Sequence, residues 1–101
     1  MIRIENVENK DEKTKVTLEI MNALPEWFSP PEDIERKSMI HREYPFFAAY
    51  DDEKAIGFAV IKRHNHYTAE IYNFGILREY HRNGIGHRLM ENCTEYCKKH
   101  G

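Results

Sequence analysis

The chain has 101 residues, of which 41% are hydrophobic and 32% are charged, and its formal net charge is -2 at pH 7. This length and composition suit one compact domain over residues 1–101. Because Lys and Arg are not in excess, nucleic acid is not expected as the principal ligand. The longest apolar run, Ala55–Ile61, is far shorter than the roughly 20 residues of a membrane helix, and residues 1–10 lack the apolar block of a secretion signal. We therefore expect a cytoplasmic protein without a membrane partner.

The first half of the chain predicts one strand and two helices. Residues 2–7 roughly follow the two-residue period of a half-buried strand, and residues 6–13 are predicted to be a polar turn. An apolar stripe at helical spacing covers residues 14–24 and stops at a proline, which cannot continue the hydrogen-bond ladder of a helix. A second helix is expected over residues 31–42, with proline and acidic residues in its first turn.

The loop between the two predicted helices carries Trp27 and Phe28 between prolines. An aromatic pair in such a loop can form a recognition surface, or it can close the core between the helices as a plug. We favour the plug for both rings.

The second half predicts three strands, a loop and a helix. Apolar runs at residues 45–50 and 55–63 flank a polar turn, and a second polar break leads into a long strand-like run at residues 67–77. This pattern predicts an antiparallel meander. Apolar residues then recur at helical spacing over residues 85–100, and Gly101 suits a C-terminal cap. The order strand, helix, helix, three strands, helix belongs to the α/β (α+β) class.

Two cysteines, Cys93 and Cys97, lie four residues apart in the last predicted helix. At that spacing their Cβ atoms are about 5–6 Å apart, whereas a disulfide requires about 3.5–4.5 Å. We therefore expect reduced thiols that pack in the core as small apolar groups. Adding His100 does not produce a zinc-ligand spacing, so no metal is expected.

The loop before the last helix has the features of an anion site. Unpaired N–H groups and the helix dipole favour negative charge at a helix start, and we expect Gly84 and Gly86 to leave room for a diphosphate. Positive charge comes from Arg82, His87 and Arg88. The dinucleotide fingerprint fails because its third glycine is missing, and the Gly-Lys-Ser/Thr of a P-loop does not occur in the sequence.

This loop resembles the signature of the GNAT superfamily of acyl-CoA-dependent N-acyltransferases, Gln/Arg-x-x-Gly-x-Gly/Ala, and reads His81-Arg82-Asn83-Gly84-Ile85-Gly86 with histidine in the first position. The Glu-Tyr lead-in and the Ile-Gly-x-Arg-Leu-Met run are also similar. The resemblance covers the whole chain and implies a GNAT-like mixed sheet. In the family the same order of elements is followed by a strand, a helix and two more strands, so we expect a truncated product, a fragment or a chain that relies on a partner.

The resemblance implies transfer of an acetyl group from acetyl-CoA to a primary amine on a small molecule or a peptide. The pantetheine arm would follow a bulge in the strand at Phe74, Gly75 and Ile76, where an N–H near Ile76 would polarise the thioester carbonyl. The residues implied to hold acetyl-CoA are Phe74, Gly75, Ile76, His81, Arg82, Asn83, Gly84, Ile85, Gly86 and His87.

A protonated amine must lose a proton before it attacks, and a carboxylate is the usual base. In the histone-acetylating branch of the family a glutamate fourteen residues before the first loop glycine has this role, and Glu70 stands fourteen residues before Gly84. The role also predicts partial burial of Glu70, which would raise its pKa; the alternative is an ordinary surface carboxylate. A catalytic tyrosine of relatives lies beyond the part of the family that this sequence covers. His41, His64 and His66 could line an acceptor site, although surface histidines are commoner than catalytic ones.

Two further interpretations remain beside the enzyme. The chain could be a non-catalytic module that binds CoA or pairs with another chain. Because the family's later elements are missing from this sequence, we expect an exposed strand edge with apolar surface and therefore a homo-oligomer. It could also be a structural protein whose Gly84 and Gly86 serve only a turn, in which case acyl-CoA would not protect the fold.

Overall fold

The computed structural model describes residues 1–28, 30–65 and 68–100. The elements in chain order are β1 (Ile2–Asn6), α1 (Lys10–Asn22), α2 (Pro31–His41), β2 (Phe46–Asp51), β3 (Lys54–Arg63), β4 (Ala69–Ile76), the 3-10 turn η1 (Arg78–Tyr80) and α3 (Ile85–His100). The predicted class and order β1-α1-α2-β2-β3-β4-α3 are confirmed, and η1 is an addition. The predictions for Tyr67, at the start of the last strand, and for Gly101, as a helix cap, lie outside the described residues.

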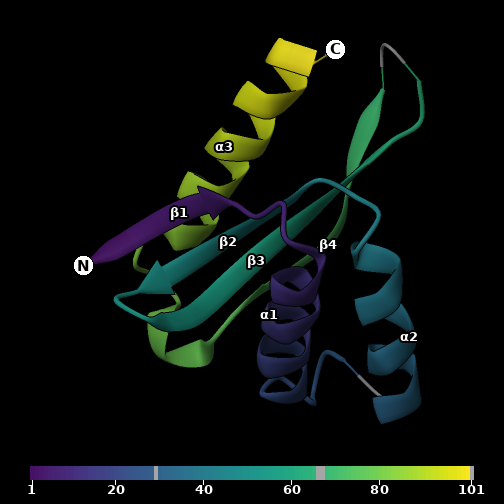
Figure 1. Ribbon diagram of the computed structural model, residues 1–101. Helices are drawn as coiled ribbons and strands as arrows, with labels where there is room; N and C mark the ends of the chain where they lie inside the picture. The colour runs from purple at the N-terminus through teal and green to yellow at the C-terminus, as the bar shows by residue number, and fades with distance from the viewer. Residues whose placement is uncertain (29, 66–67, 101) are drawn as a thin grey trace.

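The four strands form one sheet in the order β1-β2-β3-β4 (Figure 1). The predicted meander of β2, β3 and β4 is confirmed, and β1 adds to the free side of β2. Every pairing in residues 1–28, 30–65 and 68–100 is antiparallel, which differs from the mixed sheet that the family resemblance implied. The β2–β3 hairpin turns at Asp52, whose φ of 54° lies in the left-handed region that aspartate tolerates.

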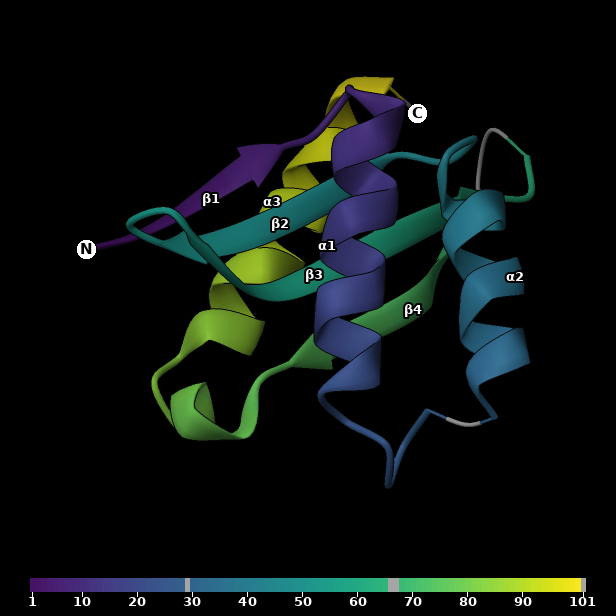
Figure 2. The same cartoon turned by 60° about the horizontal axis from the view of Figure 1, so that its bottom comes forward.

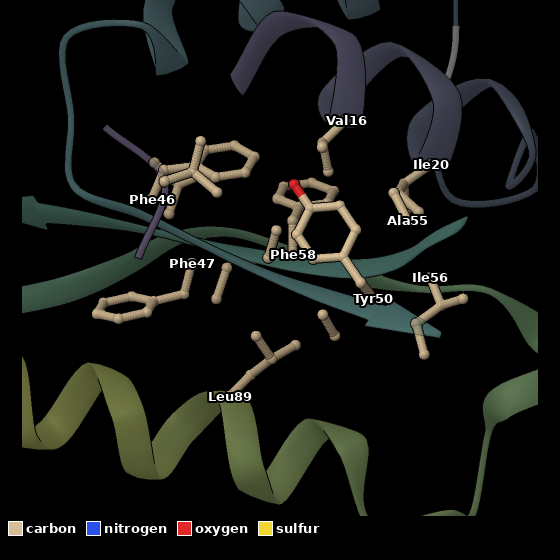
Figure 3. Packing of buried hydrophobic residues seen from close by; sticks show 14 of the residues in the cluster. Val16, Ile20, Phe46, Phe47, Tyr50, Ala55, Ile56, Phe58 and Leu89 are labelled. Atoms are coloured by element: carbon tan, nitrogen blue, oxygen red, sulfur yellow. The ribbon is translucent and has the colours of Figure 1, made fainter. Parts of the chain in front are cut away.

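The sheet lies between two layers of helices: α1 and α2 cover one face and α3 covers the other (Figure 2). Figure 3 shows Val16 and Ile20 of α1 pointing to one face and Leu89 of α3 pointing to the other. Because both faces are covered, β2 and β3 are buried along most of their length. This double burial explains why their sequences are continuous apolar runs instead of alternating patterns.

The first helix begins earlier than predicted. The side chain of Asn9 accepts a hydrogen bond from the N–H of Glu12 at 2.9 Å, so α1 starts at Lys10 and the predicted turn over residues 6–13 is too long. The first turn of α1 is too polar for the apolar stripe to reveal it. Lys13 in this turn is buried and donates to the carbonyl of Tyr44 at 2.7 Å, which ties α1 to the segment after α2.

Strand β4 contains a bulge, but not where it was predicted. Asn73 pairs with Val60 and Ile71 pairs with Ile61, so the extra residue between them is Tyr72. The residues predicted to form the bulge, Phe74 to Ile76, pair regularly with β3, and that prediction is wrong.

His41 at the end of α2 holds this bulge from one side. The Asn73 amide donates to His41 Nε2 at 2.9 Å, so the ring proton resides on Nδ1, which donates to Thr17 Oγ1 at 2.9 Å. The ring is 0% exposed, and burial lowers its pKa to about 4. His41 is therefore part of the core, and the prediction that it could line an acceptor site is wrong.

Acidification should destabilise the fold through His41. Its pKa falls from 6.5 in the unfolded chain to about 4 in the fold, so the unfolded state takes up the proton first. Neutral His41 contributes its full share to the free energy of unfolding above pH 6.5. This contribution, about 3 kcal/mol in total, is lost as the pH falls to about 4. Urea unfolding between pH 7.5 and 4.5 measures this loss.

The comparison for this experiment is a His41→Gln variant, which should lose less stability over the same pH range. His87→Gln, at an exposed histidine, should keep the wild-type slope. Equal slopes in the wild type and His41→Gln would show that other groups cause the pH dependence.

Candidate functional site

The N-terminus of α3 presents a backbone site for an anion. Gly84 has φ of 74°, and its carbonyl accepts the first helical hydrogen bond, from Arg88 N at 3.1 Å. The N–H groups of residues 85–87 therefore have no partner within the helix. A Cβ built on Gly84 meets no atom within 4 Å, so the space beside this turn is open. The turn fits a phosphate group in geometry and in the sign of its dipole.

The second loop glycine also has a role in packing that was not predicted. A Cβ built on Gly86 would lie 3.2 Å from Ile76 Cδ1 and 3.2 Å from Phe74 Cζ. The missing side chain faces β4, where it permits close packing of α3 on the strand. Of the two glycines, Gly84 opens toward free space, whereas Gly86 lines the cavity with its backbone, and its part in holding a diphosphate stays a prediction.

A cavity of about 510 Å³ joins this turn to the end of β4 and to the loop after α1. Its volume lies in the usual range of small-molecule sites. It is lined by Leu24, Trp27, Phe28, Phe74, Gly75, Ile76, Tyr80, His81, Arg82, Gly84, Ile85 and Gly86. The structure thus brings together the residues predicted to hold the cofactor, apart from Asn83 and His87, which do not line it. Sequence reasoning did not assign Tyr80 to the site.

The three predicted positive groups separate in the structure. Arg82 lines the cavity and is exposed. Arg88 instead donates to the carbonyl of Ile2 at 3.3 Å, and His87 Nε2 lies 3.6 Å from a carboxylate oxygen of Glu91. The positive charge that this cavity can use comes mainly from Arg82 and the helix start.

His81 occupies the family's Gln/Arg position and points back toward the strand. Its Nε2 donates to the carbonyl of Ile76 at 2.8 Å, and its ring centroid lies 5.7 Å from that of Trp27. His81 therefore connects the end of β4 to the loop after α1.

The aromatic pair of that loop divides between the two predicted roles. Phe28 packs against the core, where its Cε2 lies 3.5 Å from a Cβ built on Gly75. Trp27 is 59% exposed at the cavity, so the plug is wrong for this ring.

Glu70 lies outside the cavity. It lines a second groove of about 390 Å³ between β4 and α3, together with Ile71, Met90 and Cys97. Its side chain is 53% exposed, and it accepts a hydrogen bond from His64 Nε2 at 2.9 Å. The partial burial expected of a catalytic base is not found, and its catalytic role stays a prediction. His66 lies outside the described residues.

Both cysteines are free, as predicted. Cys93 is buried, which raises the pKa of its thiol to about 11, whereas Cys97 is only half-buried. Within the part of the chain that the structure describes, no group of three His, Cys, Asp or Glu side chains is placed to hold a metal ion. Among the same residues, no helix has the length and apolar character that crossing a membrane requires.

The structure is thus one four-stranded sheet covered by helices on both faces, with an anion-binding turn between the edge strand β4 and the helix α3. A model of the acetyltransferase (GNAT) family matches residues 10–101, and the chain belongs to this family. No curated protein sequence matches the chain.

Solved structures share the fold. A GNAT-family protein from Desulfovibrio desulfuricans aligns with a TM-score of 0.82 at 14% identity, covering 100% of this chain and 69% of that one. The ribosomal-protein-S18-alanine N-acetyltransferase from Escherichia coli aligns at 0.79 and 21% identity, covering 100% and 62%. The PaiA N-acetyltransferase from Thermoplasma acidophilum, in complex with coenzyme A, aligns at 0.70 and 20% identity, covering 96% and 73%. The chain therefore spans roughly two thirds of these proteins, and at such identities the likeness concerns the fold.

Replacing Gly86 by alanine should strain the contact between α3 and β4. The added Cβ would lie 3.2 Å from both Ile76 Cδ1 and Phe74 Cζ, so these side-chain ends must shift, and the resulting loss of about 1 kcal/mol acts against the similar gain from replacing a helical glycine. Ile76→Val removes one of the two contacting atoms, so the double variant should recover part of the loss. Urea unfolding of both single variants and the double variant measures this coupling.

Gly84→Ala is the matched control. Its Cβ meets no atom, so its cost of about 1–2 kcal/mol comes from the left-handed backbone alone, and Ile76→Val should not relieve it. Strict additivity of Gly86→Ala and Ile76→Val would contradict the packing role of Gly86.

Proposed function

We propose that this chain acts as an N-acetyltransferase, which transfers an acetyl group from acetyl-CoA to a primary amine of a small molecule or a peptide. The observation that carries the proposal is the cavity that joins the open turn at Gly84 to the edge of β4 in a member of the GNAT family. A thioester with a diphosphate at one end and an extended arm fits both parts of that cavity.

The diphosphate would bind at the start of α3. The free N–H groups of residues 85–87 and the guanidinium of Arg82 supply donors and positive charge there. The histidine at position 81 leaves this site intact, because most of its donors belong to the backbone.

The pantetheine arm would lie along β4 at Phe74, Gly75 and Ile76. Within the described residues β4 pairs on one side only, with β3, so the outward backbone groups on its other edge could bind an amide-containing chain, apart from the Ile76 carbonyl, which already accepts from His81. A backbone N–H in this segment would also stabilise the oxyanion that forms at the thioester carbonyl.

In the reaction the amine nitrogen attacks the thioester carbonyl carbon, a C–N bond forms and the C–S bond breaks. The protonated amine loses one proton before the attack and a second as the amide forms; the CoA thiolate departs and can take up one of them. We assign the acceptance of the first proton to Glu70, on the basis of its distance in sequence from Gly84. Because Glu70 lies in the groove beside β4, the acceptor would have to reach along the strand, or a water molecule would have to carry the proton.

A non-catalytic or self-associating protein is the alternative. The groove beside β4 has apolar side chains from both β4 and α3, and Met90 there is 42% exposed. Such a surface beside a strand edge favours association. Binding of CoA without turnover on any amine would favour this alternative.

Placing a carboxylate at Gly84 should weaken CoA binding. Gly84→Asp puts a negative charge in front of the helix start, and repulsion of a diphosphate should weaken binding at least about tenfold. Gly84→Asn is the matched control, because asparagine tolerates the same positive φ without charge. Calorimetric titration with CoA and acetyl-CoA measures both; equal loss in the two variants would show that backbone strain, and not charge, is responsible.

Removing the carboxylate of Glu70 should slow acetyl transfer and leave cofactor binding unchanged. Glu70→Gln should lower kcat about 100-fold, the usual contribution of a positioned base. His64→Ala removes the partner of Glu70 and tests whether any loss reflects the broken pair. A steady-state assay on a panel of amines gives kcat, and full activity in Glu70→Gln would exclude Glu70 as the base.

A further inference from the structure

The loop after α1 is fastened to the turn before α3 by two adjacent contacts. Arg78 Nε donates to Glu26 Oε1 at 2.8 Å and its Nη2 donates to Glu26 Oε2, which makes the pair bidentate. One residue further along the loop, the ring of Trp27 lies 5.7 Å from that of His81. The loop after α1 and η1 lie at the same end of the molecule (Figure 2).

The Glu26–Arg78 pair contributes little to the stability of the fold. The side chains are 37% and 60% exposed, and ion pairs at such exposure are weak. A bidentate pair nevertheless restricts orientation, because both oxygens and two nitrogens must stay in register. Arg78 correspondingly lowers the pKa of the Glu26 carboxyl. The effect expected of this pair is on the position of the loop.

The Glu26–Arg78 pair sets the position of Trp27. Trp27 lines the cavity and leaves most of its ring surface open, while Phe28 behind it packs on the core at Gly75. The His81 ring beside Trp27 is itself held by a hydrogen bond to the carbonyl of Ile76. The Glu26–Arg78 pair and the Trp27–His81 ring contact therefore both link the loop after α1 to the turn that leads to Gly84.

We propose that Glu26 and Arg78 are positioning residues, a latch that couples acyl-CoA bound at the start of α3 to the exposed ring of Trp27 in the wall of the same cavity. This inference rests on the proposed function for the identity of the ligand. The latch itself rests only on contacts within the chain. Acyl-CoA, by ordering residues 78–86, would order the loop that carries Trp27 through the latch.

Hydrogen exchange at two backbone amides measures how strongly the latch holds the loop after α1 closed. The N–H groups of Trp27 and Phe28 both donate to the carbonyl of Leu24, at 3.1 and 3.0 Å, so their exchange measures local opening of the loop. Glu26→Arg and Arg78→Glu should each increase exchange at these amides by about two- to fivefold, in line with the strength of exposed ion pairs. The combined Glu26→Arg, Arg78→Glu variant reverses the pair and should restore wild-type exchange.

The matched control is another exposed ion pair between distant segments. Lys10 Nζ lies 3.1 Å from Glu43 Oε2, with both side chains more than half exposed, and neither residue lines the cavity. Glu43→Arg should leave exchange at Trp27 and Phe28 unchanged. Wild-type exchange in both latch variants, or failure of the reversed pair to restore it, would overturn the latch.

Coupling is tested by adding CoA to the same samples. CoA should slow exchange at Trp27 and Phe28 in the wild type and in the reversed pair, but not in either single variant, whose CoA affinity is checked by calorimetry. If CoA binds to the wild type and these amides do not respond, the coupling is wrong. If CoA does not bind, the proposed function and the coupling both fail, whereas the latch is still decided by exchange without ligand.

Discussion

The bulge at Tyr72 determines which helical layer each side chain of β4 faces. Tyr72 and Asn73 both approach His41 on the α2 side, and the alternation then resumes with Gly75 facing Ile20 of α1. Phe74 and Ile76 consequently face α3. A shift by one residue would reverse these orientations and place Phe74 against α1, where only a glycine fits. The buried hydrogen bonds of His41 keep this register, so the edge strand of the candidate site depends on contacts from the opposite layer.

The two loop glycines depend on that register in different ways. With Phe74 and Ile76 turned toward α3, the helix can approach β4 closely only because Gly86 has no side chain. Gly84 permits the left-handed turn after which the first N–H groups of α3 lie free beside the cavity. A site made mostly from the backbone also explains why a histidine can stand at position 81: it ties the turn to Ile76 and brings its ring beside Trp27.

Most of the fold was predictable because its signals are local. Helical stripes and apolar runs depend on spacing within a segment, and they predicted in the correct order the strands and α-helices that the structure describes, although not the 3-10 turn η1. The start of α1 was missed although Asn9 followed by Glu12 resembles a capping signal, because polar residues in a first turn hide the apolar period. The loop of the candidate site was also predictable, since glycines before a helix have a direct physical role in anion binding.

The sequence by itself therefore determined the element order, the family resemblance and the anion-binding turn, all of which depend on neighbours along the chain. Only the tertiary structure decided the place of the bulge, the burial of His41, the exposure of Trp27 and Glu70, and the separation of Arg82 from Arg88. Each of these depends on contacts between residues far apart in sequence. Spacing shows which face of an element is apolar, but it does not show which distant side chain meets it.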